Sequence, residues 1–171
     1  MPIHVFVDET KSRGLLMAAA RCQADDVAVN RKALRGLLLP GQERLHFNHE
    51  RDPQRRKIVR LISEFRLTVD IYQADRDNAV SRHRCLAAIV RDNAATAERL
   101  VVERDESTFE KDGKALNAAT YRFGCHGQLR WELLMPKEDP LLWVPDAVAW
   151  CWRRGGEWRR LVRPFSEVRD L

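Results

Sequence analysis

Acidic side chains stand where the sequence predicts that strands end or a helix begins. In chain order they are Asp8 and Glu9 after a first strand, Glu103, Asp105 and Glu106 after a later strand, and Asp146 at the start of a last helix. Strand ends in a sheet built from βα units converge on one edge, so acids that are distant in sequence can meet there. Clustered carboxylates repel one another unless a cation lies between them. The pattern therefore indicates a divalent-metal site.

The ion expected at such a site is Mg²⁺ or Mn²⁺, which two-metal enzymes use to activate water and stabilise the leaving oxygen of a phosphodiester. The expected metal ligands are Asp8, Glu9, Glu103, Asp105 and Asp146. Spacing alone leaves a second interpretation open. In that interpretation the first two acids belong to a turn, the middle acids to a loop or helix cap, and Asp146 to the favourable end of a helix dipole.

The basic surplus is confined to two segments. The chain carries 30 Lys and Arg against 25 Asp and Glu, a formal net charge of +5. Residues 51–70 hold six basic and three acidic groups, residues 150–171 hold six and three, and the remainder is nearly balanced. Two such segments are typical of a polyanion-binding footprint, although two solvated faces give the same composition.

An aromatic residue lies among the arginines of the second segment. Trp158 follows Arg153 and Arg154 and precedes Arg159 and Arg160, and such interleaving can stack a base while gripping phosphates. Packing of the tail into the core is the alternative. The predicted nucleic-acid-binding residues are Arg55, Arg56, Lys57, Arg60, Arg153, Arg154, Trp158, Arg159 and Arg160.

Histidine and cysteine give weaker signals. His46 and His49 have the spacing of a metal pair, but in a strand their rings would point to opposite faces, so we expect His46 near the site and His49 exposed. Cys125 and His126 are adjacent, and neighbours in a chain rarely face each other. The four cysteines lie far apart and fit no metal knuckle, which indicates reduced, mostly buried thiols.

The elements that must position these residues follow from periodicity. An N-terminal β-hairpin is predicted from the strand Ile3–Val7, the turn KSRG and the apolar run GLLMAAARC. Helices are predicted over 27–38, 51–65 and about 79–95, with strands over RLHFN, RLTVDIYQA, ERLVVER and LRWELLM. Residues 106–127 stay ambiguous because Asp112-Gly113 interrupts a helix. Pro145 suits the first turn of a last helix. A hairpin followed by βα units implies an α/β fold with a mixed sheet flanked by helices.

The size of the chain fits one ordinary domain over residues 1–171. No apolar run approaches the roughly 20 residues that span a bilayer, and the start MPIHVFVDE does not resemble a signal peptide. These features favour a soluble, cytoplasmic protein that does not bind membranes.

Four short motifs carry a resemblance to a known family. VFVDET before an apolar strand, RLHFN before a basic helix, LVVERDES, and PDAVAWCWRRG near the end resemble the landmarks of the bacterial domain-of-unknown-function family 3800. That family is ribonuclease H-like and its members resemble transposase and Argonaute-type nuclease cores. Thr10 stands where the family has Ser. Leu142-Trp143-Val144-Pro145 stands where the family has Leu-Gln and a small residue before its Asp, which implies a different start of the last helix.

The resemblance implies a single ribonuclease H-like domain with a divalent-metal site. Its implied catalytic residues are Asp8, an acid of the ERDE segment and Asp146; Asp105 is preferred in the middle segment and Glu103 is second. The favoured function is a metal-dependent nuclease or related phosphoryl-transfer enzyme, acting on DNA or RNA. A catalytically silent nucleic-acid- or protein-binding module is the alternative. The sequence contains no triad signature of a hydrolase that uses Cys or His. Whether the protein forms a homodimer is left open by the sequence.

Overall fold

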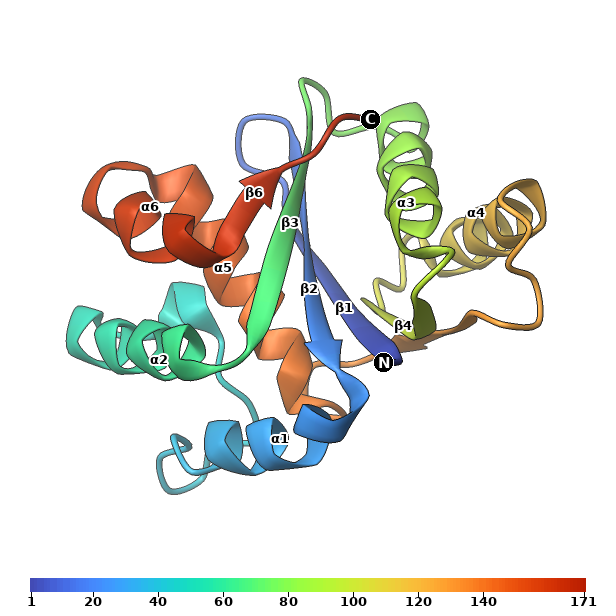
Figure 1. Cartoon of the computed structure of the whole chain (residues 1–171). Coiled ribbons are helices and arrows are strands. Elements are labelled where there is room, and N and C mark those ends of the chain that lie inside the picture. The colour runs from blue at the N-terminus through green and yellow to red at the C-terminus, as the bar shows by residue number, and fades with distance from the viewer.

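A mixed sheet of six strands forms the centre of the computed structural model, which describes residues 1–171 (Figure 1). The strands are β1 (Ile3–Thr10), β2 (Leu15–Gln23), β3 (Leu67–Ala74), β4 (Ala97–Glu103), β5 (Arg130–Leu134) and β6 (Ser166–Val168). Their spatial order is β5-β4-β1-β2-β3-β6. β1, β2 and β3 pair antiparallel, whereas β4 pairs parallel with β1 and β5, and β6 pairs parallel with β3. The predicted hairpin and mixed α/β sheet are confirmed.

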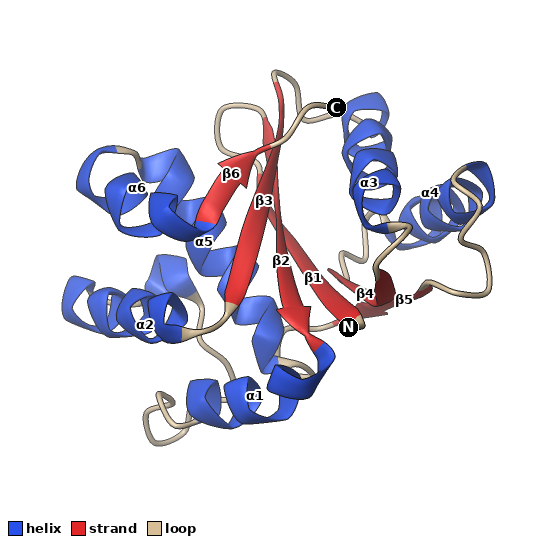
Figure 2. Cartoon of the chain, in the orientation of Figure 1, coloured by secondary structure: helices blue, strands red, loops and turns tan.

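Helices cover both faces of the sheet (Figure 2). They are α1 (Val27–Arg35), α2 (Asp52–Glu64), α3 (Ala79–Asn93), α4 (Phe109–Arg122), α5 (Trp143–Arg154) and α6 (Gly156–Val162). α1, α2, α5 and α6 lie on one face, and α3 and α4 lie on the other. None of the helices combines the length and apolarity needed to cross a bilayer.

Two hydrophobic cores result, one on each side of the sheet. Consecutive side chains of a strand point to opposite faces. Phe6 of β1 accordingly packs in the core under α5, while Val5 and Val7 pack in the core under α3 and α4. β1 is therefore buried on both sides, which explains why its apolar run is continuous up to Asp8.

The sequence prediction was wrong for residues 44–48 and incomplete at the C-terminus. RLHFN forms no strand: His46 is extended and Phe47–His49 makes one turn of 3₁₀ helix. Leu45 and Phe47 are buried in alternation, as in a strand, but the Phe47 N–H donates to the Asp146 carboxylate instead of to a neighbouring strand. Residues 109–122, within the ambiguous segment, are helical. The short α6 and β6 were not predicted.

Candidate active site

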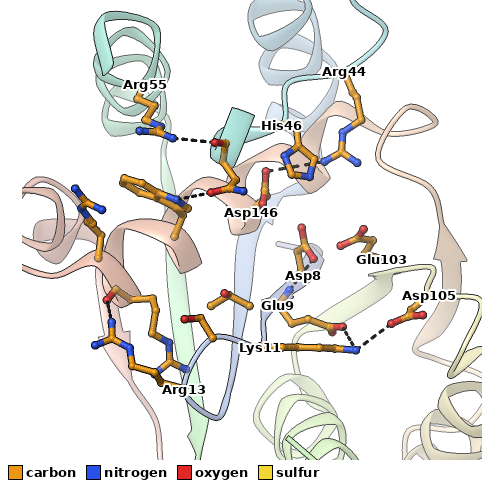
Figure 3. Close-up of a pocket in the computed structure, with 16 residues that line it drawn as sticks. Asp8, Glu9, Lys11, Arg13, Arg44, His46, Arg55, Glu103, Asp105 and Asp146 are labelled. Atoms are coloured by element: carbon orange, nitrogen blue, oxygen red, sulfur yellow. Dashed lines mark hydrogen bonds and ion pairs between the residues drawn. The ribbon is translucent and has the colours of Figure 1, made fainter. Parts of the chain in front are cut away.

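Three elements bring Asp8, Glu103 and Asp146 together. β1 and β4 run parallel, and Val7 is paired with Val102, so Asp8 lies beside Glu103 at the carboxyl ends of both strands. α5 packs across β1 and carries Asp146 in its first turn. Figure 3 shows the three carboxylates facing a common space. The predicted meeting of acids at one sheet edge thus occurs for these three residues.

The Asp8 carboxyl is the most strongly perturbed of the three. It is 3% exposed, and one of its oxygens accepts a hydrogen bond from the Glu9 N–H at 2.6 Å. Burial raises the pKa of Asp8 well above its ordinary value, and contact with the Glu103 carboxylate and the charge of Asp146 raise it further. Without a cation, this environment favours the protonated form of the Asp8 carboxyl.

Asp146 is held in place from the 3₁₀ turn that follows His46. The Phe47 N–H donates to its Oδ2 at 3.1 Å, and an Arg44 Nη2 lies 4.0 Å from the same oxygen. Burial nevertheless raises the pKa of Asp146 to about 6, with the Glu103 charge adding to the rise. Asp8 is buried, and Glu103 and Asp146 are half-buried. Three such acids with little positive charge nearby form an arrangement that favours binding a cation.

Asp105, the preferred middle acid from the sequence, points elsewhere. β4 ends at Glu103, and two residues later Asp105 accepts hydrogen bonds from the Ser107 hydroxyl and N–H, at 2.7 and 2.9 Å. Its other oxygen lies 3.2 Å from the Lys11 Nζ. The Ser107 hydroxyl and the Lys11 charge hold the pKa of Asp105 down at about 2. The structure therefore favours Glu103 over Asp105, which lies at the rim.

Glu9 is neutralised by a buried arginine. Its Oε1 lies 2.7 Å from Arg82 Nη1 and 3.8 Å from Lys11 Nζ. Arg82 itself binds Asp112 through two further bonds of 2.7 and 2.8 Å, and it is almost fully buried between α3 and α4. Glu9 thus borders the acidic site, and Arg82 of α3 balances its charge.

The acids open onto a cavity of about 760 Å³ whose opposite wall is basic. The described acids and Lys11 form one end, and arginines with one half-buried tryptophan form the other. The residues of that opposite wall are Arg13, Arg55, Trp150, Arg153 and Arg154, whereas Arg44 and His46 line the cavity beside Asp146 (Figure 3). A negatively charged ligand with a flat base or ring fits such a wall, while a cation fits the acidic end.

A divalent cation fits the donor chemistry of the acidic end. Asp8, Glu103 and Asp146 offer hard carboxylate oxygens, and Asp8 is buried without a basic partner. No group of three or more His, Cys, Asp or Glu side chains in the structure is arranged to hold a metal ion.

Comparison with known proteins identifies the fold. Neither a family model nor a curated protein matches the sequence. The structure is similar to ribonuclease HII of Archaeoglobus fulgidus, solved as a complex with PCNA, with 16% identity and a TM-score of 0.61 over 95% of this chain and 78% of that one. It is also similar to ribonuclease H2 of Pyrococcus horikoshii OT3, with 12% identity and a TM-score of 0.51 over 89% and 72%. The chain has the ribonuclease H-like fold. The finer resemblance to family 3800 and to transposases rests on the short motifs alone.

Of the basic residues predicted on α2, two make contacts within the protein and two are exposed. Arg55 lines the cavity, but it donates to the carbonyl oxygens of Phe47 and Asn48 at 2.9 Å each and stacks 4.3 Å from the Trp150 ring centre. Arg56 pairs with Glu157 at 2.7 Å. Lys57 and Arg60 are exposed on α2, away from the cavity-lining residues.

The assignment of Trp158 to base stacking needs correction. Trp158 is 8% exposed and packs in the core against Phe47 and Trp150, so it has no free face for a base. Arg159 donates twice to the Trp152 carbonyl, at 3.0 and 2.6 Å, and thereby caps the end of α5. Arg160 is exposed on α6. Of the basic residues in this segment, only Arg153 and Arg154 line the cavity.

The histidine pair differs from the prediction in geometry. His46 lines the cavity and His49 is exposed, as expected, but the 3₁₀ turn stacks their rings 4.0 Å apart instead of separating them. Burial and the Arg44 and His49 charges lower the pKa of His46, which favours its neutral form. All four cysteines are free and buried.

Several cavity residues were missed from the sequence. Lys11 and Arg13 come from the β1–β2 turn and Arg44 precedes the 3₁₀ turn. Trp150 shares a helical stripe with Asp146, which was a usable signal because it lies four residues further along α5. The turn residues carried no such signal, since their approach to α5 depends on how the helix docks.

Proposed function

We propose that this protein is a divalent-metal-dependent nuclease that hydrolyses phosphodiester bonds in DNA or RNA. The observation that carries the proposal is the group formed by the buried Asp8 and the half-buried Glu103 and Asp146, which opens onto a cavity with an arginine-rich opposite wall. The ribonuclease H-like fold, shared with two ribonucleases, supports it.

Asp8, Glu103 and Asp146 would hold Mg²⁺ or Mn²⁺, with Glu9 and Asp105 at the border of the site. The bound metal would supply an activated water and charge stabilisation at the leaving oxygen. The chain's own residues do the rest. The Phe47 N–H orients Asp146, β-sheet register fixes Asp8 beside Glu103, and the arginine wall draws the phosphate backbone toward the acids.

The second candidate is a binding module that keeps the basic wall but does no chemistry. The arginines of the wall favour it, because a polyanion can bind to them whether or not the acids act on it. The two functions differ in one property: only the nuclease needs the acids for its activity.

The test is cleavage by wild type and Asp8→Asn, with Asp25→Asn as the matched control. Asp25 is an exposed acid just beyond the end of β2. The end of β2 pairs with the start of β1, so Asp25 lies at the opposite end of these strands from Asp8. Labelled single-stranded and duplex DNA and RNA, and an RNA–DNA hybrid, are incubated with Mg²⁺ or Mn²⁺ and with EDTA. We expect cation-dependent cleavage by wild type and Asp25→Asn, and none by Asp8→Asn.

A second measurement separates metal binding from chemistry. Titration of metal-free protein with Mg²⁺ or Mn²⁺ should raise the melting temperature of wild type, since a ligand at 100 times its Kd stabilises by about 2.7 kcal/mol. Asp8→Asn should show little rise. Cleavage that survives in Asp8→Asn would refute the role of Asp8, and no cleavage with no metal-induced shift in wild type would favour the silent module.

A further inference from the structure

The basic wall of the cavity contains arginines without acidic partners. Arg13, Arg153 and Arg154 line the cavity, and none lies within 4.0 Å of an Asp or Glu carboxylate. The Nε and Nη2 atoms of Arg153 are buried and have no hydrogen-bond acceptor. Buried guanidinium donors are normally satisfied, because leaving them unpaired costs free energy. Arg153 therefore brings a positive charge without a counter-charge to the cavity wall, and its neighbour Arg154 is exposed there.

The surroundings of Arg153 are cationic. An Arg13 Nη2 donates to the Arg153 carbonyl oxygen at 3.0 Å and so fixes the β1–β2 turn against the end of α5. Burial lowers the pKa of Arg153, and the charges of Arg13 and Arg159 lower it further. Cations gathered at a cavity wall without a counter-charge form an anion site, and two guanidinium groups suit the oxygens of a phosphate.

The helix α5 sets the distance between this wall and the acids. Asp146, Trp150, Arg153 and Arg154 lie at positions i, i+4, i+7 and i+8 and share one side of the helix. With a rise of about 1.5 Å per residue, Arg153 and Arg154 lie on the order of 10 to 12 Å along α5 from Asp146. A stacked nucleic-acid strand advances about 3.4 Å per nucleotide along its axis, so this span corresponds to about three nucleotides.

We propose that Arg153 and Arg154 form a phosphate subsite that grips a nucleic-acid strand about three nucleotides from the phosphate at the acidic centre. The proposal rests on the proposed function and specifies its substrate class: a polynucleotide of at least about four nucleotides, not a mononucleotide or dinucleotide. Trp150, stacked on Arg55 and bonded through its Nε1 to Asn48 Oδ1 at 3.3 Å, forms the fixed wall between the two ends.

The test measures binding without metal, so it does not depend on cleavage. Fluorescent oligothymidylates of two and eight nucleotides are titrated with wild type, Arg153→Gln and Arg160→Gln in EDTA over a range of salt concentrations. Arg160 is the control, because it is exposed on α6 and does not line the cavity.

For the octamer we expect Arg153→Gln to weaken binding about five- to tenfold and to flatten the slope of log affinity against log salt by about 0.7, the value for one lost contact to a single strand. Arg160→Gln should have neither effect. Binding of the dinucleotide should be weaker than that of the octamer in all three proteins, because its single internucleotide phosphate makes fewer contacts with the cavity wall.

Two results would overturn the proposal: unchanged octamer affinity and slope in Arg153→Gln, or an equal loss in Arg160→Gln. The melting temperature of Arg153→Gln should be unchanged or higher, because the substitution removes one of several neighbouring positive charges. If it falls, Arg154→Gln carries the same test, because Arg154 is an exposed residue. A flattened slope together with no cleavage by wild type would keep the subsite and refute the nuclease.

Discussion

Replacing Asp146 with asparagine should stabilise the metal-free protein at neutral and alkaline pH. The folded pKa of Asp146 is about 6, against an ordinary value of 3.8. Because folding raises this pKa, the charged form is disfavoured in the folded state: the penalty is absent below about pH 4 and complete above pH 6. A rise of about two pKa units corresponds to about 2 to 3 kcal/mol in the free energy of unfolding. Wild type loses this stability as the pH rises, and the variant does not. The amide oxygen of the introduced asparagine can still accept the Phe47 N–H.

The assay is urea unfolding of wild type and Asp146→Asn in EDTA, at pH 8 and at pH 4. At pH 8 the variant should gain the full difference, which corresponds to a rise in melting temperature of roughly 4 to 12 °C for a chain of this size. At pH 4 the two curves should converge. Asp105→Asn is the control of opposite sign, because the pKa of Asp105 is lowered to about 2 and its charge stabilises the fold. Solvent screening at its rim position limits that loss to about 1 kcal/mol. An Asp146→Asn protein no more stable than wild type at pH 8 would refute the account of a repelling acid cluster.

Two further predictions concern arginines outside the acidic group. Arg82→Ala should destabilise by about 3 to 5 kcal/mol in urea unfolding, because it leaves Asp112 buried and unpaired; a change below about 1 kcal/mol would contradict this. Arg159→Ala should lower stability by about 1 to 3 kcal/mol through loss of its two bonds to the Trp152 carbonyl, while Arg160→Ala changes it by less than about 0.5 kcal/mol. Equal melting temperatures for these two variants would show that Arg159 does not cap α5.

The elements were predictable where periodicity reflects burial. β1 and α5 show it best, because residues 5–7 of β1 form a buried apolar run up to Asp8 and α5 repeats its buried positions at helical spacing. Residues 44–48 defeated the same reasoning: Leu45 and Phe47 alternate in burial like strand residues, yet the local backbone bonds to a side chain on α5. Alternation reports which side chains are buried, not which partner the backbone amide finds.

The site was predictable as a place but not in detail. Asp8 and Asp146 were identified because they follow a strand and open a helix, and Glu103 was among the expected ligands. The structure places Asp105 at the rim, which the sequence did not show, because Ser107 and Lys11 hold its carboxylate in a turn two residues after Glu103. Trp158 was misread because an aromatic among arginines looks the same in sequence whether its ring faces solvent or the core.

The acidic site is spread over almost the whole length of the chain, and this has a consequence during synthesis. Asp8 enters the first strand, but Asp146 follows it by 138 residues along the sequence. At about 5 to 20 residues per second, a ribosome needs roughly 7 to 28 seconds to add the last of the three acids after the first. The nascent chain therefore emerges with its acidic centre unassembled, and the proposed nuclease acquires activity only when α5 docks.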